Sequence, residues 1–317
     1  YQEIAGKKAN YILANPNGIY VNGAGFINTG NVTLTTGSGN NLQNPEKGTI
    51  EVDGKGLDLR NINKAELVAR VAELSAPIYG GEEVNLKLGS QGKANKPEYA
   101  LDAKALGSIY AGRINIVVNE DGVGVKTEAP MYAEKGDVVI SSKGKVYLKD
   151  TQAKGNIKIT STETEIANKL LAENLIDIKG KTTNSGQIQA NNNITINGNV
   201  DSSNLISTNK DITISGNLTN SGEVSTKNLT TNNLDNKGNI VWREKPIFHS
   251  YDLFDDNCIC GNCVYYPLCY CGCPVAREEE KIVDNKIICG HYGDYSIFKL
   301  RIQDYCWRVI LNNKVIL

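Results

Sequence analysis

Hydrophobic and polar residues alternate along residues 171–240, and the alternation repeats at a fixed interval. Set in register, the copies read LAENLIDIKGKTTNSGQIQ, ANNNITINGNVDSSNLIS, TNKDITISGNLTNSGEVS and a less regular TKNLTTNNLDNKGNIVW. A period of two residues is typical of a strand with one buried face. Isoleucine and glycine return at a constant spacing, at Ile176, Ile194 and Ile212 and at Gly180, Gly198 and Gly216. Each copy is therefore predicted to hold three short strands separated by turns.

One copy cannot bury its own apolar edge, whereas stacked copies share one continuous core. The pattern predicts an all-β solenoid, a parallel β-helix of about twelve rungs over residues 1–240. Residues 181–240 contain 15 Asn, a residue that tolerates left-handed turns and whose amide can hydrogen-bond to the same position of the next rung. An Asn-rich disordered tract and an antiparallel sandwich are the alternatives, and neither is expected to keep so constant an interval.

Residues 1–140 show the same texture with less regularity. Short strands cut by Gly, Asn and Pro are expected at 31–34, 49–52, 84–88, 113–118 and 137–140. A helix is expected over 63–74, because Leu67, Val71 and Leu74 share one helical face and Asn63 is a fair N-cap. A second helix is a candidate over 163–173, with a looped-out rung as the alternative reading.

The stretch YILANPNGIYVNGAGFINTG (residues 11–30) crowds turn residues between bulky apolar ones. Proline at position 16 fixes its own φ, and Asn17-Gly18 can supply positive φ. Asn15-Pro16-Asn17-Gly18 is therefore predicted to form a tight turn between strands. The apolar residues of the stretch are predicted to fill the interior, namely Ile12, Ile19, Val21, Phe26 and Ile27.

Composition narrows the classes of function. The 34 basic and 35 acidic residues leave a net charge of −1, which gives no electrostatic case for nucleic acid as a partner. His249 and His291 are the two histidines of the chain, and so sparse a pair argues against a catalytic triad. The acidic groups at 255–256 and 278–280 are typical of solvated charge. We expect no enzyme and no cofactor.

All eight cysteines lie in the last fifth of the chain, at Cys258, Cys260, Cys263, Cys269, Cys271, Cys273, Cys289 and Cys306. Their clustering leaves three readings open. They form disulfides in an extracellular module, or they bind a metal ion as thiolates, or they belong to a tail that was not originally part of the protein. The spacing is not that of paired Cys-x2-Cys knuckles, so the zinc signal is weak.

Three segments together carry a family resemblance. LANPNGIYVNGAGFINTGNVTLTTG (13–37), LVARVAELSAPIYGGEEVNLKLG (67–89) and ALGSIYAGRINIVVNEDGVGVK (105–126) resemble the secretion domain of filamentous haemagglutinins, in the family's order. The repeats at 171–240 are similar to the haemagglutinin repeats that follow that domain. The resemblance implies a right-handed parallel β-helix that is exported by two-partner secretion and is secreted or displayed on the bacterial surface.

The resemblance also implies partners and a division of the chain. Asn15, Pro16, Asn17, Gly18 and Ile19 match the family's motif for recognition by an outer-membrane barrel transporter. The expected units are a partial secretion domain (1–150), haemagglutinin-type repeats (151–240) and a Cys-rich segment (241–317). The expected function is that of an adhesin for a host-cell or neighbouring-cell receptor. The alternative is the delivery stalk of a contact-dependent growth inhibition toxin, with its effector in 241–317. The family's earlier capping region and Asn-Pro-Asn-Leu motif are not present, so the chain is expected to begin inside the domain.

Overall fold

The computed structural model describes residues 2–3, 6–243, 281–283 and 286–288. The chain divides into two compact units, Tyr1–Arg243 and Glu244–Leu317. In the second unit the description is confined to β28 (Lys281–Val283) and β29 (Lys286–Ile288), which pair antiparallel. The histidines, the acidic groups at 255–256 and 278–280 and all eight cysteines discussed above lie outside the described residues.

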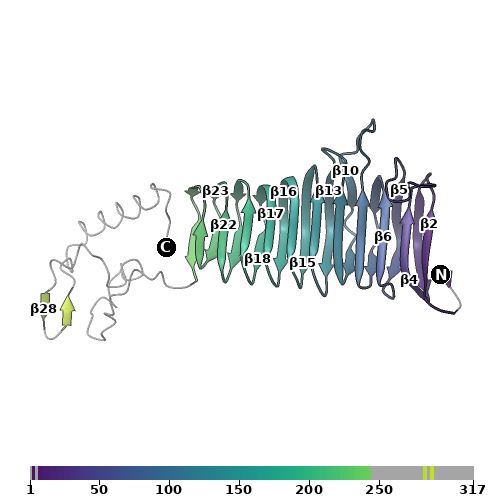
Figure 1. The fold of residues 1–317 in the computed structure, drawn as a ribbon. Coiled ribbons are helices and arrows are strands. Elements are labelled where there is room, and N and C mark those ends of the chain that lie inside the picture. Colours follow the sequence, from purple (N-terminus) through teal and green to yellow (C-terminus); the bar gives the residue numbers. More distant parts are fainter. Residues whose placement is uncertain (1, 4–5, 244–280, 284–285, 289–317) are drawn as a thin grey trace. The chain divides into compact units, whose positions relative to one another are not determined.

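The first unit is a parallel β-solenoid whose strands stack in three sheets (Figure 1). The first sheet comprises β2 (Ala9–Ala14), β4 (Thr29–Thr35), β6 (Lys64–Ala69), β9 (Glu83–Leu88), β12 (Arg113–Val118), β14 (Val138–Ser142), the start of β16 (Ile157–Ala172), the start of β17 (Ile176–Asn184), β19 (Ile194–Asn197), β22 (Asp211–Ile214) and β25 (Asn228–Thr230).

The second sheet shares the longer strands with its neighbours. It comprises the first parts of β3 (Ile19–Ile27) and β5 (Thr49–Leu59), then β7 (Val71–Leu74), β10 (Tyr99–Ala103), the first parts of β13 (Gly124–Ala133) and β15 (Lys145–Ala153), the middle of β16, the end of β17, β20 (Val200–Ser202), β23 (Asn217–Asn220) and β26 (Asn233–Asn236).

The third sheet stacks twelve strand segments. They are β1 (Gln2–Glu3), the later parts of β3 and β5, β8 (Ile78–Gly80), β11 (Ile109–Ala111), the later parts of β13, β15 and β16, β18 (Gln187–Ala190), β21 (Leu205–Thr208), β24 (Glu223–Thr226) and β27 (Asn239–Trp242). The predicted all-β parallel solenoid of about twelve rungs is thus confirmed.

The core consists of columns in which each inward side chain lies on its equivalent in the next rung. One column of the first sheet runs through Leu13, Leu34, Leu67, Leu86, Ile116, Ile140, Ile159, Ile178, Ile196 and Ile214. From Leu34 onward its members are at most 2% exposed. Stacking at about 4.8 Å brings these side chains into contact along the whole rod, which is how short strands together bury a continuous core.

The fixed interval of the repeats proves to be the register of the rungs. Ile176 pairs with Ile194, which pairs with Ile212. In the last rung the interval becomes shorter, since Asp211 pairs with Asn228 and β23 pairs with β26 at a closer spacing. The turn before β25 holds one residue where the turn before β22 holds two, which explains part of the shortening.

The two expected helices are wrong, because both segments are strands. Residues 63–74 form β6 and β7, which meet at Arg70. Leu67 pairs with Leu34 on one side and Leu86 on the other, so stacking on two neighbours overrides the local helix signal. Residues 163–173 lie largely within the 16-residue strand β16, which runs continuously from the first sheet through the second into the third.

The predicted interior residues of the stretch 11–30 divide by register. Ile19, Val21 and Phe26 are buried as predicted, whereas Ile12 and Ile27 are 57% and 44% exposed. Tyr11 and Leu13 occupy the inward register of β2, opposite Val32 and Leu34. Because side chains alternate between the two faces of a strand, Ile12 and Ile27 must point outward.

Candidate functional site

The Asn15-Pro16-Asn17-Gly18 segment forms the predicted tight turn between β2 and β3. The amide of Gly18 donates to the carbonyl of Asn15 at 3.1 Å, and the Asn15 side chain accepts from the Asn17 amide at 3.1 Å. Gly18 has a φ of +122°, and a Cβ there would lie 3.1 Å from the Thr49 carbonyl oxygen. Glycine is therefore required by both conformation and space. Asn17 does not share the positive φ.

The turn presents part of the predicted recognition motif to solvent. Asn15 and Asn17 are exposed, whereas Ile19 is buried and stacks on Ile50. Three large apolar side chains lie on the strands that flank the turn, with Ile12 57%, Leu13 39% and Tyr20 59% exposed. Ile12 and Tyr20 lie at outward positions, whereas Leu13 holds the inward register, so these residues add exposed apolar area near the turn without forming one patch.

An ion pair between Arg70 and Glu120 fixes a loop to the side of the solenoid. Glu120, which follows β12, is fully buried and receives the Arg70 guanidinium through two hydrogen bonds of 2.8 and 3.2 Å. The Ser90 amide donates to the same carboxylate at 2.9 Å. Arg70 also donates to the carbonyls of Ala94 and Asn95, so the pair holds the loop 89–98 against the rungs.

The charges of this pair support each other. Burial works to raise the pKa of Glu120, but the hydrogen bonds from Arg70 and Ser90 outweigh it, and that pKa lies below its ordinary value. The contact with Glu120 raises the pKa of Arg70. The residues are 50 positions apart, so no local pattern in the sequence indicates that they meet. They serve to fix a loop and do not face a cavity.

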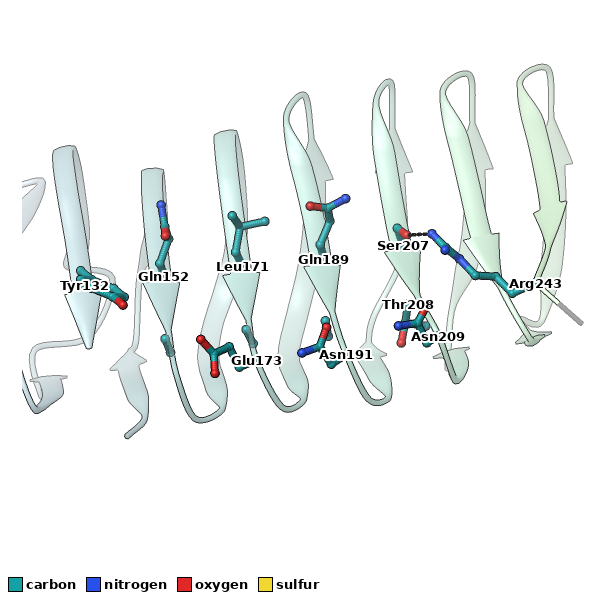
Figure 2. A pocket seen from close by; sticks show the side chains of 13 residues that line it. Tyr132, Gln152, Leu171, Glu173, Gln189, Asn191, Ser207, Thr208, Asn209 and Arg243 are labelled. Atoms are coloured by element: carbon teal, nitrogen blue, oxygen red, sulfur yellow. Dashed lines mark hydrogen bonds between the residues drawn. The ribbon is translucent and has the colours of Figure 1, made fainter. Parts of the chain in front are cut away.

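A groove of about 410 Å³ runs along the third sheet (Figure 2). Its outward side chains come from one position on each of five successive rungs, at Tyr132, Gln152, Leu171, Gln189 and Ser207. A second row follows the strands at the corner, with Glu173, Asn191 and Asn209. The remaining lining residues are Ala153, Ala172, Ala190, Thr208 and Arg243.

The sequence reading missed these groove residues. Gln152, Leu171, Gln189 and Ser207 follow one another at nearly the interval of the repeats, so the period marks them once the inward positions are known. The described residues hold no group of three or more His, Cys, Asp or Glu that could bind a metal ion. Across this same part of the chain, no helix has the length and apolarity to cross a membrane.

The described residues of the first unit form a parallel β-solenoid, and the first part of this solenoid matches a known protein family. Residues 1–148 match the family described as TPS secretion domain. Residues 1–148 are thus similar to the secretion domain of two-partner-secreted exoproteins, a class of proteins that are secreted or exposed at the cell surface. The domain implies a partner outer-membrane transporter.

Several curated proteins are similar to this chain. It is 37% identical over 186 residues to the toxin CdiA of Escherichia coli and, over the same length, to the tRNA nuclease CdiA of E. coli O6:K15:H31 (strain 536 / UPEC). It is 34% identical over 201 residues to the 16S rRNA endonuclease CdiA of Enterobacter cloacae subsp. cloacae. These alignments cover 53%, 53% and 57% of this chain and 6% of each relative. The chain therefore spans only a small part of the length of the curated relatives it matches.

A crystal structure of a filamentous hemagglutinin secretion domain is also similar, with a TM-score of 0.42 and 20% identity. The alignment covers 76% of this chain and 69% of that one.

Proposed function

We propose that this chain is a haemagglutinin-like adhesin of the cell surface, in which the β-helix is a binding fibre that acts without catalysis and without a cofactor. The observation that supports the proposal is the continuity of the solenoid. Strand stacking passes from the secretion domain into the regular repeats and on to Trp242 without a break. A rod of this kind repeats similar side chains at every rung, so it offers a long surface to a receptor on a host or neighbouring cell.

The adhesin proposal is tested by display. Cells that express the full chain with its transporter are expected to attach to a target-cell layer more than cells that express the transporter alone. A variant that lacks residues 244–317 is expected to keep this attachment, because the unit that holds the solenoid runs to Arg243. Equal attachment with and without the full chain would overturn the proposal, provided that the chain is detected at the surface.

We propose that the turn at residues 15–18 and the apolar side chains beside it contact the transporter. The exposure of Ile12 and Tyr20, together with that of Asn15 and Asn17, supports this role. The double substitution Ile12→Ser and Tyr20→Ser is expected to lower the secreted fraction while the purified protein keeps its melting temperature. Leu106→Ser, at a side chain 74% exposed and remote in sequence, is the matched control. Unchanged secretion of the double variant would count against the contact.

A second candidate function rests on the names of the relatives. The similar proteins are described as toxin, tRNA nuclease and 16S rRNA endonuclease CdiA. The first unit would then be the stalk of a contact-dependent growth inhibition toxin, with the effector in 241–317. Growth competition with unprotected neighbouring cells tests it. Inhibition that requires residues 244–317 would favour the toxin, whereas adhesion that survives their deletion favours the fibre.

A further inference from the structure

The groove on the third sheet is built by a regular feature of the rungs. Tyr132, Gln152, Leu171, Gln189 and Ser207 follow one another along β13, β15, β16, β18 and β21, as Figure 2 shows. Four steps between stacked strands make this row about 19 Å long. The row therefore offers apolar surfaces and carboxamides at even spacing along the rod, and an evenly spaced row suits a ligand that is itself a linear polymer.

Small side chains at the strand ends leave the hollow beside this row. Ala153, Ala172 and Ala190 occupy equivalent positions in consecutive rungs and are at most 7% exposed. The corner residues Glu173 and Asn191 stand beyond them as the second row of Figure 2.

The two ends of the groove are marked by larger side chains. Tyr132 lies at one end. At the other, the Arg243 guanidinium donates to the Ser207 hydroxyl at 2.7 Å and covers it, so that Ser207 is only 4% exposed. One carboxylate, Glu173, and one guanidinium line the groove, so it has no charge excess that would select a polyanion.

The polar side chains of the groove have unused hydrogen-bonding capacity. Within the described part of the chain, Gln152, Gln189 and Asn191 make no side-chain hydrogen bond, although Asn192, next to Asn191, donates to Asn174 at 2.6 Å. A carboxamide both donates and accepts. Its best complement is a group that does the same, as a sugar hydroxyl does.

The backbone argues against an extended peptide as the ligand. Strands β15, β16, β18 and β21 pair on both sides with the neighbouring rungs, which uses their amides and carbonyls within the rod. A peptide that binds by strand addition needs a free sheet edge, and the face of a stacked sheet provides none. Side-chain amides beside the apolar surfaces of Leu171 and Tyr132 instead match a ring with polar edges and C–H faces.

We propose that this groove binds an uncharged linear glycan that lies along the axis of the solenoid. Gln152, Gln189 and Asn191 hydrogen-bond to sugar hydroxyls, and Leu171 and Tyr132 contact the C–H faces of the rings. The inference deepens the proposed adhesin function by naming the class of receptor, and it rests on that function for its biological sense.

Binding to defined oligosaccharides tests the inference on the full chain. The probes are neutral hexasaccharides of glucose, galactose, mannose and N-acetylglucosamine, together with an acidic hexamer of galacturonate, titrated by calorimetry. At least one neutral chain is expected to bind, and its affinity to rise with length until the chain spans the about 19 Å of the groove. No binding of any neutral probe at millimolar concentration, or preference for the acidic hexamer, would overturn the inference.

A matched pair of variants locates the site. The double substitution Gln152→Ala and Gln189→Ala is expected to weaken binding about thirtyfold, because two hydrogen bonds of about 1 kcal/mol each are lost. Gln187→Ala removes the same side chain from the same strand β18, outside the groove, and is expected to leave the affinity unchanged. Equal effects of the two changes would show that the groove is not the site. If the groove double variant still mediates attachment of cells like the wild type, the glycan inference fails and the adhesin proposal stands.

Discussion

The two ends of the described solenoid reach the same architecture with different chemistry. Rungs within residues 1–148 vary in length and carry the long loops 36–48 and 89–98, whereas those after residue 176 keep one constant length until the last turn. Twelve ion pairs of the described residues lie at positions up to Lys181. The irregular part thus uses particular long-range contacts, and the regular part relies on repetition.

One interior column of the second sheet shows the change directly. It begins with Val21, Val52, Leu74, Ala103, Thr127, Leu148 and Ile166 and continues with Asn184, Ser202, Asn220 and Asn236. Asn184 is 1% exposed and donates to Ser202 at 3.0 Å, and Asn220 donates to Asn236 at 2.7 Å. Polar groups are tolerated inside because the repeat places a partner one rung away.

An amide placed in the apolar part of that column is expected to lower the free energy of unfolding more than any other change proposed here. Leu74 is fully buried between Val52 and Ala103, so Leu74→Asn would have no polar partner in its column. We expect a loss of about 4 kcal/mol in the free energy of unfolding, from lost packing and an unpaired polar group. Urea denaturation measures it, with the exposed Leu106→Asn as control. A cost near that of the control would show that the apolar rungs also satisfy amides.

The ion pair between Arg70 and Glu120 is expected to have the next largest effect. Glu120→Gln leaves the partly exposed Arg70 guanidinium without its counter-charge, which costs about 3 kcal/mol at about pH 7. The pKa of Glu120 lies below its ordinary value of 4.5. The stabilisation is therefore present above that value and is lost as the pH falls through the lower folded pKa.

Urea denaturation of both proteins at about pH 7 and about pH 3 gives the comparison. The difference in stability between wild type and Glu120→Gln is expected to shrink at the lower pH. A difference that stays constant would mean that folding does not lower the pKa of Glu120, contrary to the direction that its contacts predict.

Within the regular part, removal of one member of the polar column should cost less. Asn184→Ala removes the hydrogen bond to Ser202, the bond to the Leu205 carbonyl at 3.2 Å and the acceptor of the Gly186 amide. We expect about 2 kcal/mol of destabilisation. Thermal unfolding measures this, with Asn197→Ala at an exposed position of β19 as the control. If both variants melt alike, the interior amides contribute no more than surface ones.

The turn at residues 15–18 gives the smallest expected effect. Gly18→Ala combines a φ of +122° with a Cβ that would meet Thr49, whereas Gly39→Ala has a φ of +55° and no atom within 4 Å. A positive φ alone costs about 1 kcal/mol, and we expect the contact at Gly18 to raise the total to about 2 kcal/mol. Equal melting temperatures of the two variants would assign the whole effect to the backbone conformation.

The sequence was informative where the structure repeats itself. The spacing of Ile176, Ile194 and Ile212 predicted the register, because a stacked rung must return each inward side chain to the same place. The tight turn at Pro16 was predictable for a local reason, since proline and glycine fix the backbone themselves.

The errors arose where distant segments decide the structure. The segment at Leu67 has a helical pattern, yet its strand conformation is set by Leu34 and Leu86 on either side. The pairing of Arg70 with Glu120 depends on the number of rungs that separate them. The long loops make the rungs of this region unequal in length, so the periodicity of the sequence does not give that number. The groove was missed because its residues lie at outward positions. The residue type there changes from rung to rung, so these positions show no repeating hydrophobic pattern.

The direction of the backbone hydrogen bonds has a mechanical consequence for a fibre anchored at one end. These bonds join each rung to the next along the axis, so a pull on the rod passes through every rung in series. Each junction then bears the full tension, however strong its neighbours are. Failure should begin where strands are short, as at the three-residue β8, β11, β20 and β25, and not at the 16-residue β16. Three-residue strands occur both in the secretion domain and in the repeats, so weak junctions lie in both parts of the rod.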